Sequence, residues 1–249
     1  MHIEIALTPA SVTPLRLKGR QAVIIDVLRC TTSMLTALAN GARGVIPTRG
    51  VTEATELRTK LGASTARMGG ERGGMRIENF DLGNSPSEYT RDAVGGRMVV
   101  MFTTNGTPPF VNLRFDGPVW IGAFLNLAAL ARKIGASGQD TLIICAGNDG
   151  DFSIEDTLCA GALLRGIETG IGGEVGANDA ARVAGTLYDS HKTHLLETVR
   201  AGEHARKLTK LGYGGDIDYA MRRDTLALTP RLNSDGIVAS ASQSTVAVS

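Results

Sequence analysis

Aromatic residues and an excess of charge of one sign are both scarce in this chain of 249 residues. One Trp, four Tyr and six Phe make up 4% of it, and the formal net charge is +1. Nucleic-acid binding needs a large basic field, and base stacking needs aromatic side chains among the basic ones. The composition therefore predicts no nucleic-acid partner.

Long apolar runs and paired cysteines are missing as well. No run approaches the ~18 apolar residues that a membrane span requires. The three cysteines are odd in number and lack C-x-x-C spacing, which argues against a disulfide framework or a structural zinc site. The first ten residues do not show a basic leader followed by an apolar region. We expect reduced thiols, no membrane contact and a cytoplasmic location.

What the sequence does contain is an alternation of short apolar runs with helical patterns. This alternation predicts a three-layer α/β/α fold with a largely parallel or mixed sheet. Beyond residue 153 the spacing is almost entirely helical, so the C-terminal half should be helix-rich. No linker divides the chain, which indicates a single domain over residues 1–249 or two intertwined α/β lobes. The expected strands are at 3–7, 22–26, 44–47, 98–102, 118–124 and 141–147.

Three further segments differ in composition from the rest of the chain. The apolar run 225–230 ends in a proline and reads as an edge strand. Residues 233–249 are small and polar enough for a loose tail. The Gly-rich, charged segment 69–85 is longer than a usual connection of about 4–6 residues, and such loops tend to be functional or disordered. Its charged side chains favour a function.

Polar side chains follow three of the expected strands directly. Asp26 and Arg29 follow the second strand, the sequence TTNGT (103–107) follows the strand at 98–102, and Glu155 and Asp156 follow the strand at 141–147. In an open parallel sheet, ligands bind beyond the carboxyl ends of the strands. Carboxylates at that edge are well placed to hold a metal ion. The pattern predicts one site assembled from all three strand ends.

Helix capping offers a simpler interpretation of each segment taken alone. Thr31 or Thr32, and Thr104 or Asn105, have side chains suited to a helix N-terminus. Two other sets fit capping patterns at N-cap, N1 or N3 positions: Ser153 with Asp156, and Ser85 with Pro86 and Glu88. Capping does not explain why carboxylates and an arginine gather at the same sheet edge.

Several motifs occur in a fixed order along the chain. They are VIIDVLRCTTSMLTALANGA, GGERGG leading to FDLGNSPSEY, FTTNGT, GAFLN and CAGNDGDFSIEDTLCAGAL. Together they resemble the 2-phosphosulfolactate phosphatase (ComB) family over about residues 24–167, and more weakly over 201–232. The resemblance implies an α/β/α phosphatase that uses Mg²⁺ and acts on a small anionic phosphate monoester in coenzyme M biosynthesis. It is compatible with a homodimer.

The same resemblance implies roles for individual residues. Catalytic roles fall to Asp26, Arg29, Glu71 and Asp156. Substrate contacts fall to Arg72, Asn84, Thr103, Thr104, Asn105, Gly106 and Thr107. Metal ligation falls to Asp26, Asp81, Glu155 and Asp156.

These residue types suit phosphate ester hydrolysis. Arginines offer paired donors to phosphate oxygens, and the hydroxyls and amides of TTNGT would form an oxyanion cradle, with Gly106 allowing close backbone approach. Mg²⁺ needs one or two carboxylates and keeps several waters. The alternative is a binding protein for a phosphorylated or sulfonated metabolite that performs no chemistry. Carboxylates beside a bound anion would repel it unless a cation lay between them, so a metal-dependent enzyme is favoured.

Overall fold

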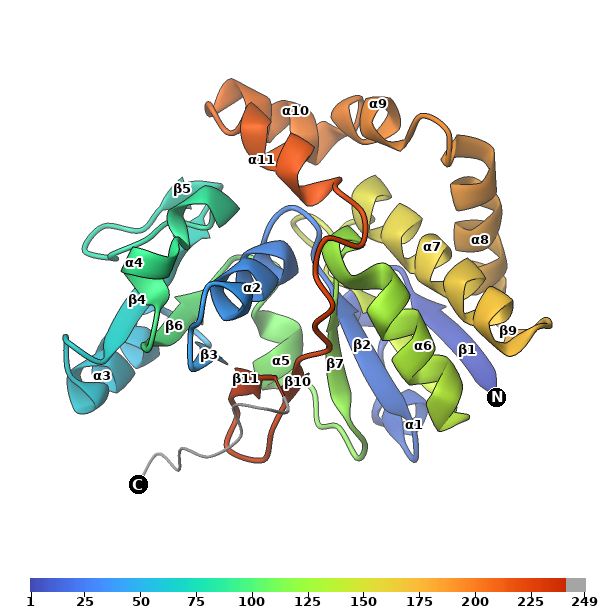
Figure 1. Ribbon diagram of the computed structural model, residues 1–249, viewed down its shortest axis with the longest axis horizontal. Coiled ribbons are helices and arrows are strands. Elements are labelled where there is room, and N and C mark those ends of the chain that lie inside the picture. The colour runs from blue at the N-terminus through green and yellow to red at the C-terminus, as the bar shows by residue number, and fades with distance from the viewer. Residues whose placement is uncertain (241–249) are drawn as a thin grey trace.

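The structure is a computed structural model that describes residues 1–240 of the 249. In this part of the chain eleven strands form one sheet, in the order β5-β4-β6-β3-β11-β10-β7-β2-β8-β1-β9 (Figure 1). Helices cover both faces, so the predicted three-layer α/β/α architecture with a mixed sheet is confirmed. The C-terminal half is rich in helices, as expected.

The long strands of the sheet are parallel and form two groups. One group is β4, β6 and β3, and the other is β7, β2, β8 and β1. Most of their residues are buried on both faces, which explains why they read as continuous apolar runs. Their bounds are β1 His2–Ala6, β2 Gln21–Ile25, β3 Gly44–Pro47, β4 Ala66–Arg72, β6 Met98–Phe102, β7 Val119–Gly122 and β8 Thr141–Cys145.

A short C-terminal hairpin joins the two groups into one sheet. Its strands are β10 (Arg231–Leu232) and β11 (Val238–Ala239), antiparallel to β7 and β3 respectively. The edge strand predicted at 225–230 is wrong, because this segment forms no strand and the pairing begins one residue later, inside the sheet. The loose tail predicted from residue 233 is wrong up to residue 240, because β11 is buried; residues 241–249 lie outside the described part.

Five longer helices form the outer layers. Met34 and Leu35 of α2 pack on one face of the sheet. On the other face, α6, α7 and α8 share a core with β1, β2 and β8, and α3 packs beside β4 and β6. Their bounds are α2 Cys30–Ala39, α3 Val51–Leu61, α6 Leu127–Ser137, α7 Ile154–Ile171 and α8 Asp179–His191. The shorter elements are the helices α1 Pro14–Leu17, α4 Arg91–Val94 and α5 Pro108–Asn112, the 3₁₀ turns Pro9–Ser11, Pro86–Glu88 and Phe124–Asn126, and the edge strand β9 Gly176–Ala177.

The Gly-rich segment predicted as a loop over 69–85 is partly regular structure. Its first four residues continue β4, which then turns back into the two-residue strand β5 (Met75–Arg76). At Gly70, with a φ of 140°, a Cβ would fall 1.8 Å from the carbonyl oxygen of Phe102 on β6. The glycine therefore permits a close approach of two strands, and the sequence pattern does not distinguish this use from a loop.

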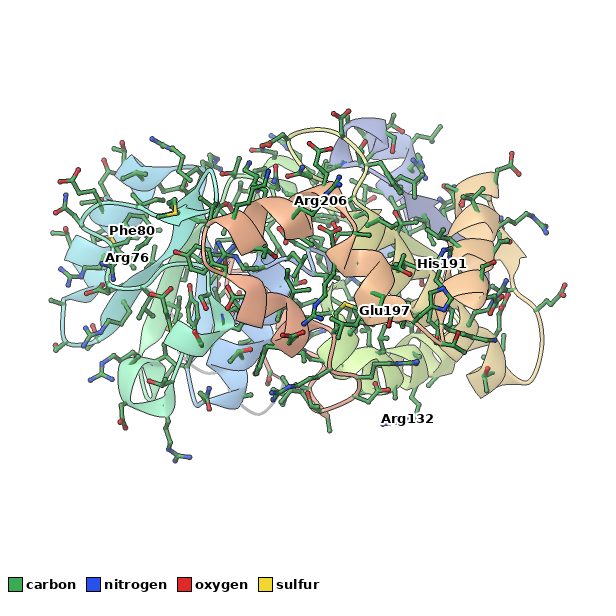
Figure 2. All side chains as sticks on the ribbon, turned by 90° about the horizontal axis from the view of Figure 1, so that it is seen from above. Arg76, Phe80, Arg132, His191, Glu197 and Arg206 are labelled. Atoms are coloured by element: carbon green, nitrogen blue, oxygen red, sulfur yellow. The ribbon has the colours of Figure 1, made fainter. Side chains whose placement is uncertain are left out.

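Three helices follow α8 and lie over the carboxyl ends of the strands (Figures 1 and 2). They are α9 (Leu195–Arg200), α10 (Glu203–Lys210) and α11 (Gly214–Ala220). Their apolar residues, such as Leu208 and Ile217, share a core with Val27 and Leu28 from the loop that follows β2. The helical C-terminal half thus roofs the sheet edge where ligands of parallel sheets bind. No helix in residues 1–240 is long and apolar enough to span a membrane.

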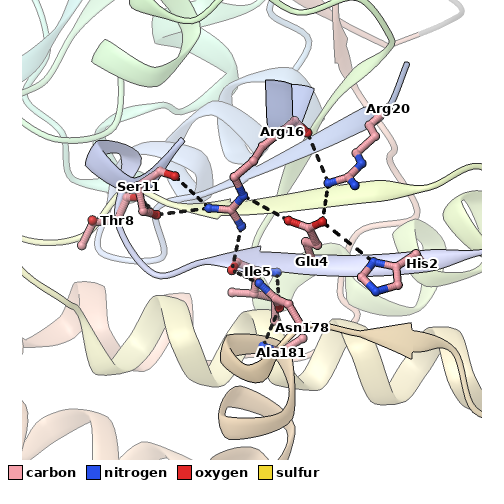
Figure 3. A network of polar contacts seen from close by, with 9 residues as sticks. All are labelled: His2, Glu4, Ile5, Thr8, Ser11, Arg16, Arg20, Asn178 and Ala181. Carbon is pink, nitrogen blue, oxygen red and sulfur yellow. Dashed lines mark hydrogen bonds and ion pairs between the residues drawn. The ribbon is translucent and has the colours of Figure 1, made fainter. Parts of the chain in front are cut away.

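Polar contacts surround β1 near one edge of the sheet (Figure 3). Glu4 accepts hydrogen bonds from Arg16 and Arg20, and its carboxylate lies 4.0 Å from His2. Asn178 binds both backbone groups of Ile5 and also caps α8. These contacts hold the start of α8 against β1.

Candidate active site

A pocket lies beneath α10, where β2, β4, β6 and β8 end. It brings together six of the residues predicted from sequence, including Asp26 and Asn105, which come from opposite groups of strands. The lining residues are Asp26, Leu28, Arg29, Glu71, Gly73, Gly74, Asn84, Thr104, Asn105, Asn148, Asp149, His204 and Lys207. Six of the residues named from sequence, which follow distant strands, therefore line one pocket.

Asp26 lies at the centre of the pocket, directly after β2. Its Oδ1 accepts a hydrogen bond of 3.0 Å from the backbone amide of Cys30 at the start of α2. Its Oδ2 makes no hydrogen bond within residues 1–240. A Cβ on Gly106 would fall 2.3 Å from this oxygen, so the glycine leaves room beside it. Asp26 thus offers one free carboxylate oxygen to whatever occupies the pocket.

The surroundings of Asp26 disfavour its charged form. Its pKa is raised from 3.8 to about 6: burial is the largest cause and the nearby carboxylates of Glu71 and Glu155 add to the shift, while the amide of Cys30 and the side chain of His204 oppose it. A buried carboxylate with neighbours of like charge is a frequent feature of catalytic and metal sites. A cation beside Oδ2 would relieve this cost.

Arg29 is buried in the pocket wall and held on three sides. Its Nη1 donates to Asp216 of α11 at 2.8 Å, and its Nη2 donates to the carbonyl of Gly74 at 2.7 Å. The ring of Tyr213 lies 4.2 Å from the guanidinium carbon. A guanidinium has five N–H donors, so donors remain for a bound anion. Asp216 also accepts a hydrogen bond from Ser85, which ties α11 to the start of the turn Pro86–Glu88.

Glu71 forms part of the pocket wall through its own hydrogen bonds. Its carboxylate accepts from the backbone amide of Gly74 at 2.6 Å and from that of Thr104 at 2.7 Å. The hydroxyl of Thr104 also donates a hydrogen bond of 3.3 Å to this carboxylate. Both oxygens of Glu71 are therefore engaged in joining β4 to the turn after β6.

The TTNGT turn uses most of its polar groups on itself. The hydroxyl of Thr103 accepts from the amides of Gly106 and Thr107, and the hydroxyl of Thr107 accepts from the amide of Thr103. With the amide of Thr104 bound to Glu71, the predicted oxyanion cradle does not have these amides free. Thr103 and Thr107 are buried behind the pocket, and only Thr104 and Asn105 line it. Hydroxyl groups that suit a bound anion also suit a tight turn, and in TTNGT the turn itself uses them.

Two asparagines contribute amides to the pocket. Asn105 accepts a hydrogen bond from the backbone amide of Asp149 at 3.1 Å, which joins the loops after β6 and β8. Asn84 is 4% exposed, and its Oδ1 has no hydrogen-bond partner among the described residues. Buried polar atoms are normally paired. Oδ1 of Asn84 is therefore available to a ligand or a hydrated ion in the pocket.

Asp156 lies just outside the pocket lining. Its two oxygens accept from the backbone amides of Val27 and Gly147, at 2.8 and 3.1 Å, so it ties the loops after β2 and β8 together. Burial, followed by the charges of Asp26 and Glu155, raises its pKa well above the usual range. Asp156 supports the loop that carries Asp26, and both of its oxygens have partners.

Glu155 faces a histidine. In the first turn of α7, its Oε1 lies 3.3 Å from Nδ1 of His204 on α10, and both side chains are largely buried. Glu155 does not line the pocket, whereas His204 does. The carboxylate implied as a metal ligand is thus occupied by a neighbouring side chain.

Two residues implied by the resemblance lie elsewhere. Arg72 is exposed, with its guanidinium 5.9 Å from the ring of Phe102. Asp81 accepts from the backbone amide of Met68 and lies 3.7 Å from Arg58. Neither lines the pocket. Alternation along a strand explains Arg72, because the side chain after Glu71 points to the other face.

Several pocket residues were not predicted from sequence. His204 and Lys207 come from one face of α10, and Lys207 lies 3.5 Å from Asp149. Asp216 of α11 reaches Arg29. The i, i+3 spacing of His204 and Lys207 in a short polar helix is the signal that could have identified them.

The capping alternatives have mixed outcomes. Ser153 caps α7 by accepting from the amide of Asp156, as one interpretation predicted. Ser85 precedes the turn Pro86–Glu88 but its side chain makes no cap. Thr31 bonds to the carbonyls of Asp26 and Gly122 instead of capping α2, and neither Thr104 nor Asn105 caps α5. Capping therefore does not account for the polar residues around Asp26.

The donor set of the pocket can be tested against Mg²⁺. Within residues 1–240 no three His, Cys, Asp or Glu side chains cluster around a position that could hold a metal ion. Mg²⁺, however, usually binds through one or two carboxylates together with waters. The free Oδ2 of Asp26 and the unpaired oxygen of Asn84 are oxygen donors of the kind that this ion prefers. The residues present fit a magnesium ion held largely by waters.

The fold and the pocket define a three-layer α/β protein with a charged small-molecule site at the carboxyl edge of its sheet. A family model described as 2-phosphosulpholactate phosphatase matches residues 6–235. The chain belongs to the 2-phosphosulfolactate phosphatase family.

Similar proteins support the assignment. Three relatives bear the name probable 2-phosphosulfolactate phosphatase. The one from Caldanaerobacter subterraneus is 37% identical over 238 residues, which cover 96% of this chain and 98% of the relative. Those from Thermotoga maritima and Gloeobacter violaceus are 35% and 38% identical, covering 92% and 87% of this chain and 95% and 90% of the relatives. The resemblance seen in the motifs is confirmed.

Proposed function

We propose that this protein hydrolyses a small anionic phosphate monoester with the help of Mg²⁺. The substrate suggested by the names of its relatives is 2-phosphosulfolactate, which would give sulfolactate and phosphate. The observation that carries the proposal is the pocket itself. Its lining includes Asp26, which has a carboxylate oxygen without a hydrogen-bond partner among the described residues, and the basic side chains of Arg29 and Lys207.

The balance of charge supports a cation in the site. Asp26 and Glu71 line the pocket, and Glu155 and Asp156 lie directly behind it. These carboxylates would repel a phosphate dianion and oppose its attraction to Arg29 and Lys207. A divalent cation at Asp26 would turn that repulsion into attraction. This favours a metal enzyme over a protein that only binds anions.

The chain's own residues have distinct tasks under this proposal. Asp26 and Asn84 would hold the ion, which when bound would neutralise charge on the phosphate oxygens. The remaining donors of Arg29 would orient the phosphoryl group, because Asp216 and Gly74 fix the guanidinium in place. Lys207 would attract a second anionic group as a mobile point charge. Phosphoryl transfer needs mainly such positioning and charge stabilisation.

Release of inorganic phosphate from 2-phosphosulfolactate, measured while Mg²⁺ is titrated, tests the proposal. We expect turnover that saturates with Mg²⁺ and stops in excess EDTA. Binding of the ester without phosphate release at any Mg²⁺ concentration would instead identify a non-catalytic binding protein. Full activity in excess EDTA would show that the protein hydrolyses the ester without Mg²⁺.

A further inference from the structure

His204 and Glu155 form a buried pair at the edge of the pocket that the roles above leave unused. Nδ1 of His204 lies 3.3 Å from Oε1 of Glu155, and the side chains are 14% and 2% exposed. His204 lines the same pocket as Asp26. The pair therefore connects the first turn of α7, through α10, to the pocket.

The two nitrogens of the His204 ring have different surroundings. Nδ1 faces the carboxylate of Glu155, whereas Nε2 makes no hydrogen bond within residues 1–240. A carboxylate against one ring nitrogen fixes the orientation of an imidazole and stabilises its protonated form. The ring nitrogen left for the contents of the pocket is Nε2, from which a protonated imidazole would donate.

We propose that His204, oriented by Glu155, is the general acid that protonates the leaving oxygen of the phosphate ester. This inference rests on the proposed phosphatase function. The bond between phosphorus and the ester oxygen breaks, its electron pair stays on that oxygen, and the proton on Nε2 of His204 moves to it to form the alcohol. Water supplies the oxygen of the new bond to phosphorus, one of its protons passes to solvent, and His204 takes a proton back from solvent. The sum is ester plus water giving alcohol plus phosphate.

The leaving group explains why such an acid matters here. The alkoxide of a lactate-type ester is a strong base and leaves slowly unless it is protonated. General acid catalysis typically contributes about 10²- to 10⁴-fold to such steps. Arg29 is fixed by Asp216 and Gly74, and a guanidinium does not give up its proton in proteins. Lys207 is partly exposed and lies 3.5 Å from Asp149. Among the basic side chains that line the described pocket, His204 is the imidazole, whose ring can donate a proton and take one back, and it is largely buried against a carboxylate.

The test compares two forms of the same substrate, 2-phosphosulfolactate and its analogue with sulfur in the bridging position. A thiolate leaves without protonation, so only the oxygen ester needs the acid. The substitution His204→Asn suits the test, because the asparagine amide can take the place of Nδ1 against Glu155 while Nε2 is removed. We expect it to slow the oxygen ester about 10²- to 10⁴-fold and the sulfur ester less than about 5-fold. His204→Gln provides a second variant with the same expectation.

Glu155 acts as a positioning residue in this scheme and has its own readout. Glu155→Gln should slow the oxygen ester by roughly 10-fold, again with little effect on the sulfur ester, and Glu155→Asp should recover part of the loss. A purely structural role of Glu155 would change the melting temperature and slow both esters alike.

A matched control lies on the far side of the molecule. His2 and Glu4 form another histidine–glutamate pair, 4.0 Å apart and remote from the pocket (Figure 3). His2→Asn should leave both esters unaffected. Equal slowing of both esters by His204→Asn, or no slowing of either, would overturn the assignment. Turnover of neither ester by the wild-type protein would instead refute the phosphatase function itself.

Discussion

The carboxylate of Glu71 accepts a hydrogen bond of 2.7 Å from the backbone amide of Thr104. Because it also accepts one from Gly74, it joins the end of β4 to the turn that follows β6. The amide that an incoming phosphate would find at the start of that turn is thus already satisfied by the chain. Glu71 shapes the pocket wall, and this role can be separated from direct catalysis.

Substitution of Glu71 by Gln should destabilise the protein by about 1–3 kcal/mol. A glutamine offers one acceptor oxygen, so one of the two backbone donors in the wall is left without a partner. Urea unfolding measures the loss. Glu78→Gln is the control, since Glu78 is exposed on the following turn and should change the stability by less than about 0.5 kcal/mol. Equal midpoints for both variants would show that the two hydrogen bonds contribute little.

Asp26→Asn should abolish turnover and yet stabilise the metal-free protein at neutral pH. Burial raises the pKa of Asp26 to about 6 in the folded state, from 3.8 in the unfolded one. Between these values the folded state binds more protons, so the stability of the wild type falls as the pH rises from about 4 to about 6 and stays lower above it. Asparagine does not ionise and avoids this penalty, which for about two pKa units is about 3 kcal/mol.

Urea unfolding at a series of pH values, with EDTA present, measures this difference. The advantage of Asp26→Asn should be full near pH 8 and vanish near pH 4. Asp116→Asn, at an exposed position, should follow the wild type at every pH. If Asp26→Asn is less stable than the wild type at pH 8, burial of the charged Asp26 carboxylate does not lower the stability of the folded state.

Magnesium should raise the melting temperature of the wild type and not that of Asp26→Asn. An ion that binds only the folded state stabilises it in proportion to the logarithm of its concentration, and Asp26 offers the free carboxylate oxygen of the pocket. Differential scanning fluorimetry over a range of Mg²⁺ concentrations provides the measurement, with Asp116→Asn again expected to respond as the wild type does. Equal shifts in all three proteins would place the ion elsewhere.

Asp216→Ala should cost about 3–5 kcal/mol of stability, because it leaves the buried guanidinium of Arg29 without its partner. The chain offers a control on the same helix. Asp218 pairs with Arg200 on the surface, and Asp218→Ala should cost less than about 1 kcal/mol. Chemical unfolding compares the two. In the proposed reaction, kcat/KM should fall only for Asp216→Ala, and similar losses for both variants would contradict the positioning of Arg29 by α11.

Gly106→Ala should impair both stability and turnover. The added Cβ would fall 2.2 Å from Cβ of Cys30 and 2.3 Å from Oδ2 of Asp26, so the turn or the aspartate must move. Gly170→Ala, in α7, meets no atom within 4 Å and should be neutral or slightly stabilising. Thermal unfolding measures the loss of stability, and phosphate release measures the loss of turnover. Wild-type behaviour of Gly106→Ala would show that Asp26 does not need this space.

The parallel strands could be predicted from sequence because burial on both faces gives continuous apolar runs, as in β2 and β8. The hairpin of β10 and β11 could not. Each strand has two residues, and their place between β7 and β3 depends on pairing with segments more than a hundred residues earlier in the chain. Local sequence patterns do not predict pairing between segments so far apart in the chain.

The candidate site likewise contains residues that could be predicted from sequence and residues that could not. Asp26 and Asn105 could be predicted because each directly follows a recognisable strand, and the carboxyl ends of parallel strands share one edge. His204, Lys207 and Asp216 come from helices whose place over that edge is set by packing between distant segments. The sequence also does not distinguish a hydroxyl that serves a ligand from one that closes its own turn, as Thr103 shows.

The hairpin of β10 and β11 has a consequence for how the protein is made. Asp26 and Asn148 belong to one group of parallel strands, Glu71 and Thr104 to the other, and the two groups are hydrogen-bonded to each other only through residues 231–239 within the described sheet. These residues are translated after every other strand. The two groups of strands therefore cannot be hydrogen-bonded into one sheet until residues 231–239 have been translated, however early the strands within each group pair.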